Sequence, residues 1–502
     1  MRWCLPLLVG CAAPSERLPK ADDFSVADDS PVSTDSGGST VDSASDSAVD
    51  SAVDSAVDSA EDTADPLDAD GDGVQVPDDC DDTNPDVHPD ATEVCDNGLD
   101  DDCDGQTCRW DGTGAVVRTG RASDSAGAGV ALGDVTGDGV VDVLVGAPDA
   151  AAGDRPGSVW LWPGPLPETD GLLEDGGTAL GSDAVAAGAG RFVRVPGDLN
   201  GDGYAELVVG THHFPDVAAG RFAVWMGPVD GPVSEPDAWL PVPEDLGLHL
   251  FVATGPTVGA TATLLVGAPL EGGGVVRVLD GSRAGEWSLD DALVTWTAAG
   301  GAAGRSVAVP GDWDGDGVDD VVIGVPDASR VAVFRGPVTD AAVEDADHWL
   351  EPDDARATFG TEVMGAGDVD GDGLADVLAA VAVNEGDAGT VGLFCALAEC
   401  ARFDGQAAGD QLGHALTTLG DADRDGHADV VLAAHGSGSV GVWYGPLSGS
   451  HALDTADASA SVGGQAGFSM AAADGWVALG APTAGTSDPP AGGVVLVGLP
   501  DF

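Results

Sequence analysis

The sequence predicts an all-β body of seven repeated units, preceded by a disordered linker and a small disulfide-stapled module. Gly contributes 76 and Pro 31 of the 502 residues, whereas aromatic residues make up only 5%, which indicates a chain rich in turns. An acidic, glycine-rich loop followed by an apolar strand recurs along the body every 53–64 residues. Internal repetition with this period is typical of repeat folds and outranks local propensity in predicting the fold.

The charge of the chain restricts its partners. Lys and Arg number 18 against 87 Asp and Glu, so the formal charge is −69. Nucleic-acid binding requires basic surface, so we expect no nucleic-acid partner, and bound cations are favoured instead. The sequence has no uninterrupted apolar run of about 18 residues, the length that a membrane-spanning helix needs. We therefore expect contact with a membrane only through a covalent anchor.

The N-terminus has the features of an export signal with a lipid attachment site. Residues 1–10 are a short basic-then-apolar stretch, which predicts a lipoprotein signal peptide. The sequence LVGC at residues 8–11 resembles a bacterial lipobox, which implies cleavage before Cys11 and lipidation of that residue. An ordinary secretory signal with an incidental cysteine is the alternative. We expect an exported protein, and the lipobox implies a lipoprotein of the outer membrane or cell surface.

Residues 11–67 are predicted to be a disordered, lipid-anchored linker. They are rich in Asp, Ser and Ala, contain an Ala-Val-Asp-Ser repeat and have almost no aromatic residues. Such a segment cannot bury a core, and repulsion between its like charges keeps it extended. We therefore expect it to be a spacer between the anchor and the folded parts.

Residues 68–108 combine closely spaced acids with four cysteines, which we interpret as a Cys-rich, calcium-binding module. Carboxylates fall at places 1, 3, 5 and 12 of an EF-hand-like loop with Gly73 at place 6, and a second run repeats the spacing. The predicted ligands are Asp68, Asp70, Asp72, Asp79, Asp100, Asp102 and Asp104. The pattern resembles the metal-binding motif of MopE-type bacterial surface proteins and, more distantly, thrombospondin type 3 repeats. A zinc site of cysteines and His88 is the alternative, and the cysteine pairing stays open.

Five of the seven loops in the body keep a set of oxygen ligands. Oxygen-bearing side chains occupy places 1, 3, 5 and 9, place 7 offers a backbone carbonyl, and a glycine near place 6 permits the turn, as calcium requires. The predicted ligands are Asp134, Thr136, Asp138 and Asp142; Asp198, Asn200, Asp202 and Glu206; Asp312, Asp314, Asp316 and Asp320; Asp368, Asp370, Asp372 and Asp376; and Asp421, Asp423, Asp425 and Asp429. The first two sets contain fewer aspartates, so we expect them to be the weaker sites.

The other two loops have lost their acids. In the third unit, Pro256, Val258 and Ala260 stand at the ligand places, so no calcium is expected there. The seventh unit, at residues 471–482, keeps only the apolar strand and the terminal Gly-Ala-Pro.

Each unit is framed by a Gly seven or eight residues before its first acid and by a Gly-Ala-Pro-like turn after its apolar strand. With these marks in register, residues 111–502 resemble the FG-GAP repeats of the integrin α-subunit headpiece, which implies a seven-bladed β-propeller. Only one strand, residues 493–497, follows the last loop, so we expect residues 115–118 to complete the seventh blade and close the ring. Cys395 and Cys400 flank a turn, which predicts a local disulfide.

The resemblance implies a calcium-stabilised, surface-tethered binding or adhesion protein with a protein or glycan ligand at the propeller face. Motifs of hydrolases, zinc proteases and phosphate-binding loops are absent from the sequence, so we expect no enzymatic activity. Two alternatives remain, an extracellular propeller enzyme (a glycan lyase or hydrolase) and a structural component of the cell envelope. We interpret His212 and His213 as a surface loop, with a transition-metal or catalytic role as the alternative. Recurring tryptophans such as Trp160 and Trp443 are interpreted as blade packing rather than a sugar platform.

Overall fold

The computed structural model describes most of the body and part of the module before it. The described residues are 116–498 without 122–123, 151–156, 167–168, 181–188, 211–220, 230–235, 242–248, 254–262, 353–355, 382–386, 462–465, 474 and 483–491, together with short runs between 69 and 103. The predicted signal peptide, the linker and Cys11 lie outside the described residues.

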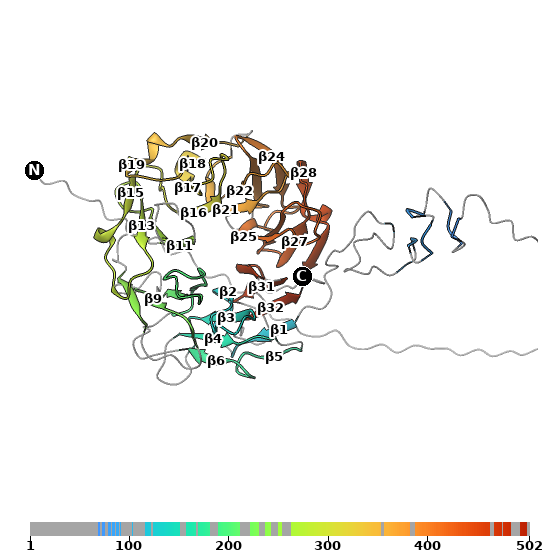
Figure 1. Cartoon of the computed structure of the whole chain (residues 1–502), viewed down its shortest axis with the longest axis horizontal. Coiled ribbons are helices and arrows are strands. Elements are labelled where there is room, and N and C mark those ends of the chain that lie inside the picture. Colours follow the sequence, from blue (N-terminus) through green and yellow to red (C-terminus); the bar gives the residue numbers. More distant parts are fainter. Residues whose placement is uncertain are drawn as a thin grey trace, which may run out of the picture. The chain divides into compact units, whose positions relative to one another are not determined.

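Seven antiparallel sheets surround one axis as the blades of a β-propeller, which confirms the predicted fold (Figure 1). Blades 1 to 3 comprise β2 (Val130–Gly133), β3 (Asp142–Ala147), β4 (Ser158–Trp162) and β6 (Thr178–Leu180); β7 (Phe192–Arg194), β8 (Leu207–Gly210), β9 (Arg221–Trp225) and β10 (Ala238–Pro241); and β11 (His249–Ala253), β12 (Thr263–Ala268), β13 (Val275–Asp280) and β15 (Val294–Thr297).

The remaining four blades have the same strand order. Blades 4 to 6 comprise β16 (Val307–Gly311), β17 (Asp320–Val325), β18 (Arg330–Phe334) and β20 (His348–Leu350); β21 (Phe359–Gly367), β22 (Asp376–Val381), β23 (Thr390–Cys395) and β24 (Ala398–Asp404); and β25 (Leu412–Gly420), β26 (Asp429–Ala434), β27 (Ser439–Trp443) and β29 (Ala458–Ser461). Blade 7 comprises β30 (Ser469–Ala473), β31 (Trp476–Ala481), β32 (Gly493–Gly498) and β1 (Val116–Thr119).

The ring closes through strands from the two ends of the body, as the sequence predicts. β1 pairs antiparallel with β32, with Val117 opposite Val495 and Thr119 opposite Gly493 (Figure 1). The observed strand is shifted by one residue from the expected 115–118. This pairing covers an edge of β32 that would otherwise expose unpaired backbone groups.

Short parallel strands join neighbouring blades along their outer edges. The segment between the third and fourth strands of a blade reaches the outermost strand of the blade before it and adds two to four residues to that sheet. The pairs are β5 (Gly171–Leu172) with β1, β14 (Gly285–Glu286) with β10, β19 (Ala341–Ala342) with β15, and β28 (Gly449–Ala452) with β24. Three of these segments continue into short 3-10 turns, η1 (Leu289–Asp291), η3 (Val343–Asp345) and η4 (Leu453–Thr455), and η2 (Pro326–Ala328) follows β17.

A separate apolar core fills each of the seven interfaces between neighbouring blades. Between blades 5 and 6, for example, Leu378 and Phe403 pack with Leu432 and Trp443. Each blade is covered on both faces, so its second strand is buried at nearly every position, as in β17 and β26. These strands therefore appear in the sequence as continuous apolar runs rather than as alternating patterns.

Candidate metal centres

The five acidic loops lie at the same place in their blades, between the first and second strands. In blade 4, for instance, the loop starts at Asp312, directly after β16, and ends at Asp320, the first residue of β17. The loops therefore have rigid strands on both sides, which hold their ends in place.

The first aspartate of each loop organises the backbone around itself. In blade 4 the N–H groups of Gly315 and Gly317 donate to the two carboxylate oxygens of Asp312, at 2.7 and 2.8 Å. Both glycines have positive φ, 82° and 86°, a conformation that most side chains disfavour. Asp134, Asp198 and Asp368 make equivalent bonds. This local network lies within six residues of sequence.

Carboxylates converge in four of the five loops. In each group, one oxygen from every member lies within 4.8 Å of one from every other member. The groups are Asp198, Asp202 and Glu206; Asp312, Asp314 and Asp316; Asp368, Asp370 and Asp372; and Asp421, Asp423 and Asp425. The structure thus brings together places 1, 3 and 5 in blades 4, 5 and 6, and places 1, 5 and 9 in blade 2.

The loop of blade 1 differs from the other four. Within the described residues, its three aspartates form no such converging group. Thr136 stands at place 3, and its hydroxyl lies 3.5 Å from Asp134 Oδ1 and 3.4 Å from Asp142 Oδ1. The expectation that the sites of blades 1 and 2 are the weaker ones stays a prediction, and blade 2 has a converging group.

The acid at place 9 is completely or almost completely buried in all five loops. The exposed fraction of Asp142, Glu206, Asp320 and Asp429 is 0%, and that of Asp376 is 1%. One oxygen accepts the N–H of the residue at place 2, which for Asp320 is Trp313, at 2.8 Å. This carboxylate therefore joins the start of its loop to the start of the second strand.

Burial raises the pKa of the acids at place 9. The pKa of Glu206 rises to about 7, through burial first and through the charges of Asp198 and Asp202 in addition. Asp376 and Asp429 also reach a pKa of about 7 for the same two reasons. Repulsion between close carboxylates is of the kind that a bound divalent cation relieves, so these loops fit a metal ion.

A second recurring motif completes the setting of the buried acid, and the sequence-based prediction missed it. The other oxygen of Asp142, Asp320 and Asp429 accepts the N–H of a glycine 16 or 22 residues further on, at 2.8–2.9 Å. That glycine belongs to the motif Trp/Phe-x-Gly-Pro, at residues 162–165, 225–228, 334–337 and 443–446, and its peptide bond to proline is cis. The sequence does contain a signal for this motif, because Gly-Pro recurs four times shortly after the aromatic residue that ends a strand.

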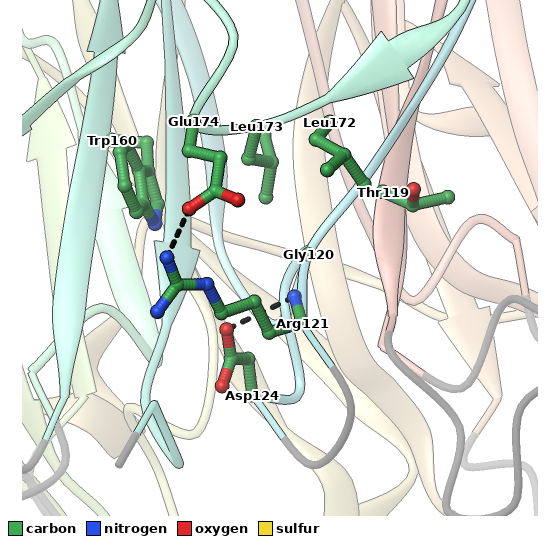
Figure 2. A pocket seen from close by; sticks show the side chains of 8 residues that line it. All are labelled: Thr119, Gly120, Arg121, Asp124, Trp160, Leu172, Leu173 and Glu174. Atoms are coloured by element: carbon green, nitrogen blue, oxygen red, sulfur yellow. Dashed lines mark hydrogen bonds and ion pairs between the residues drawn. The ribbon is translucent and has the colours of Figure 1, made fainter. Parts of the chain in front are cut away.

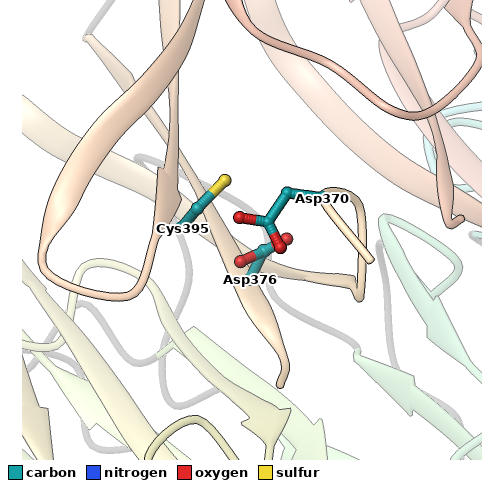
Figure 3. A group of neighbouring side chains, drawn as sticks. All are labelled: Asp370, Asp376 and Cys395. Carbon is teal, nitrogen blue, oxygen red and sulfur yellow. The ribbon is translucent and has the colours of Figure 1, made fainter. Parts of the chain in front are cut away.

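Blade 5 has a disulfide hairpin where blades 1, 2, 4 and 6 have Gly-Pro. Cys395 lies beside Asp370 and Asp376, and one ligand atom of each lies within 4.8 Å of the others (Figure 3). The sulfur of Cys395 is bonded to Cys400, which confirms the predicted disulfide. A disulfide sulfur is not a thiolate, so this trio offers a metal only its two carboxylates.

The N-terminal module is described only in part. Cys80 is bonded to Cys103, so neither thiolate is free for zinc. Asp79 is 3% exposed and accepts the N–H of Asp81 at 2.9 Å. Asp70 is also described, whereas the predicted ligands Asp68, Asp72, Asp100, Asp102 and Asp104 lie outside the described residues.

Other candidate residues take structural positions. Trp162, Trp225 and Trp443 are at most 5% exposed and belong to the cores between blades, in agreement with blade packing. His212 and His213 lie outside the described residues, as do Pro256, Val258 and Ala260 of the degenerate third loop.

A small recess lies beside the ring closure. Trp160, Leu172 and Leu173 form much of its wall, and Arg121 pairs with Glu174 inside it (Figure 2). The N–H of Arg121 also donates to Asp124 at 3.0 Å. Because its charged groups satisfy one another, we assign no ligand to the recess.

Among the described residues, no helix is long and apolar enough to cross a membrane.

The strands, the acidic loops and their repetition define the class of protein, a β-propeller whose loops carry candidate metal sites. Residues 126–162 and 195–225, which include the loops of blades 1 and 2, match the FG-GAP repeat family. Residues 79–107 match the family Cu-binding MopE, described as a "putative metal-binding motif". The chain therefore carries FG-GAP repeats in a seven-bladed propeller, together with a MopE-type motif. These motifs and the disulfides are features of extracellular or cell-surface proteins.

Solved propellers are distantly similar to the chain. The WD40 domain of coronin from Toxoplasma gondii is 10% identical, with a TM-score of 0.45, over 77% of this chain and 86% of that one. The WD40 propeller domain of Doa1 is 9% identical, with a TM-score of 0.41, over 76% of this chain and 95% of that one.

Proposed function

We propose that this protein is a calcium-binding, surface-tethered binding or adhesion protein whose propeller loops are held by calcium. The main support is the convergence of three carboxylates in each of four loops. Calcium takes six to eight oxygen ligands from flexible loops, and carboxylates together with a backbone carbonyl are its usual protein donors. Zinc prefers nitrogen and sulfur, which these loops do not offer at places 1, 3, 5 and 9.

Calcium has a structural role in this proposal. Each loop joins the first two strands of a blade, so an ion in it would tie the two strands together. At a calcium concentration tenfold above Kd, one site adds about 1.4 kcal/mol of stability, so five independent sites add about 7 kcal/mol. That is comparable with the total stability of about 5–15 kcal/mol of a typical domain.

The adhesion role rests on analogy with integrin-like propellers and on the predicted anchor and spacer. In this proposal, Cys11 carries the lipid, residues 11–67 hold the propeller away from the membrane, and a protein or glycan binds one face of the ring. Cys11→Ser should release the protein from membranes or leave it unprocessed. An unchanged soluble distribution of both forms would refute the anchor.

Calorimetric titration of the full chain carrying Cys11→Ser tests the calcium sites. We expect about five calcium ions in the propeller besides those of the N-terminal module. A total of two or fewer would overturn the ligand assignment. Screening the same protein on glycans and matrix proteins, with and without chelator, tests adhesion, and turnover of an arrayed glycan would favour the enzymatic alternative.

A further inference from the structure

The metal loops of blades 4, 5 and 6 are hydrogen-bonded to one another around the ring. The N–H of Ala375, in the loop of blade 5, donates to the carbonyl of Asp312 in blade 4 at 3.1 Å. The N–H of Ala428, in the loop of blade 6, donates to the carbonyl of Asp368 in blade 5 at 2.7 Å. Each bond joins place 8 of one loop to place 1 of the loop before it.

The donating peptide group also belongs to the predicted ligand set of its own loop. The N–H of Ala428 and the carbonyl of His427 are part of one peptide unit, and that carbonyl stands at place 7, the backbone ligand place. A cation coordinated by this carbonyl oxygen orients the whole peptide plane and polarises its N–H group. The hydrogen bond to Asp368 of the neighbouring loop then becomes better aligned and stronger.

The side chain at place 7 makes a second contact between the same loops. A Cβ on Gly371 would lie 2.3 Å from Cε1 of His427, so the imidazole packs directly on the blade 5 loop. Likewise, a Cβ on Gly315 would lie 3.2 Å from Cδ2 of Leu374. Gly315 and Gly371 both have positive φ and stand at place 4 of their loops. A loop ordered by its own cation thus places a side chain on the turn of the next.

We propose that the loops of blades 4, 5 and 6 bind calcium cooperatively, as a linear relay in which the middle loop is coupled to both ends. This inference rests on the proposed calcium binding and concerns how the sites regulate one another. Blades 1 and 2 stand outside the relay, because the degenerate third unit separates them from blade 4. Coupling between binding sites is reciprocal, so each ion raises the affinity of its neighbour by the same factor.

The test compares loss of the middle site with loss of an end site. Asp134→Asn and Asp198→Asn first weaken the sites of blades 1 and 2 in the full chain. In this background, Asp370→Ala removes the middle site and Asp423→Ala removes an end site. Both substitutions are at place 3, and each removes a hydrogen bond to the backbone N–H at place 5. Asp370 is exposed, whereas Asp423 is only 9% exposed. Each leaves two sites of the relay.

The two variants should give different calcium isotherms. Without the end site, the sites of blades 4 and 5 should still bind with a Hill coefficient above 1. Without the middle site, the two remaining sites should bind independently, with affinities at least about fivefold lower. Equal isotherms with Hill coefficients of 1 in both variants would overturn the relay while leaving calcium binding intact. Absence of calcium binding by the wild-type propeller would instead overturn the proposed function.

A third variant probes the contact without touching a carboxylate. In the same background, His427→Ala keeps every predicted ligand but removes the ring from Gly371. We expect the number of bound ions to stay the same and the Hill coefficient to fall. An unchanged Hill coefficient would show that the side-chain contact contributes nothing to the coupling.

Discussion

The guanidinium of Arg335 pairs with Asp314 in the blade 4 loop, where Arg335 Nε lies 3.0 Å from Asp314 Oδ2. Arg335 precedes the glycine of the Gly-Pro motif, at the position held by Pro163, Met226 and Tyr444 in other blades. The guanidinium would thus compete with a bound cation for one of the three converging carboxylates. The blade 4 site should be weaker than its three aspartates suggest.

Arg335→Met should tighten calcium binding in blade 4. An exposed ion pair contributes about 1 kcal/mol or less, so we expect up to about a fivefold gain in affinity, measured by calorimetry. Arg335→Lys keeps the charge and is the control, for which the affinity should stay within about twofold of wild type. An unchanged affinity in the Met variant would mean that the pair does not compete with the ion.

The buried acid at place 9 should matter for folding even without metal. Asp320→Ala leaves the N–H groups of Trp313 and Gly336 without their acceptor, and each unsatisfied buried donor costs about 1–3 kcal/mol. We therefore expect a loss of about 3 kcal/mol in chemical denaturation with chelator present. Asp316→Ala, in the same loop but exposed, should cost less than about 1 kcal/mol under these conditions. Equal losses would contradict the separation of roles.

Removal of β1 should open the ring. β1 pairs with β32 on one side and with β5 on the other, and Leu173 N–H donates to Thr119 O at 2.8 Å. Deletion of residues 12–124 should therefore lower the midpoint of thermal unfolding and promote aggregation. Deletion of residues 12–110, which keeps β1, is the control and should do neither. Equal midpoints and solubility would refute closure by this strand.

Acidification should destabilise the propeller through His414. Burial and the neighbouring His435, with ring centroids 4.3 Å apart, lower the pKa of His414 to about 4. Between pH 6.5 and 4 the unfolded chain binds a proton at this residue that the folded chain does not bind. The contribution of neutral His414 to the free energy of unfolding is therefore complete above pH 6.5 and is lost as the pH falls. The loss amounts to about 2 kcal/mol at pH 5.

His414→Gln isolates this effect by difference. Carboxyls with a raised pKa, such as Glu206, have the opposite effect on stability as the pH falls. The free energy of unfolding is therefore measured for both proteins in saturating calcium, at pH 7 and at pH 5, and the two differences are compared. The variant should lose less stability than the wild type between these pH values. A parallel loss in both proteins would rule out His414 as the source.

Much of the propeller could be predicted because its units repeat. Seven copies in register set the number of blades, and the single strand at residues 493–497 left one place for β1 to fill. The loop turns were also predictable, because the carboxylate of Asp312 accepts the N–H groups of Gly315 and Gly317, which lie within five residues of it. The pairing of Cys80 with Cys103 was not predictable, because four cysteines in a short module allow more than one pairing.

The repeat count and the places of the acids thus follow from the chain alone, since each depends on residues close together in sequence. Three features arise only from the tertiary structure: the burial of Asp320 against Gly336, the pairing of Arg335 with Asp314, and the bond from Ala428 to Asp368. Each joins residues from different strands or different blades. The distance in space between the two residues of each pair depends on how the strands pair and how the blades pack around the axis. The spacing of residues along the sequence does not give that distance.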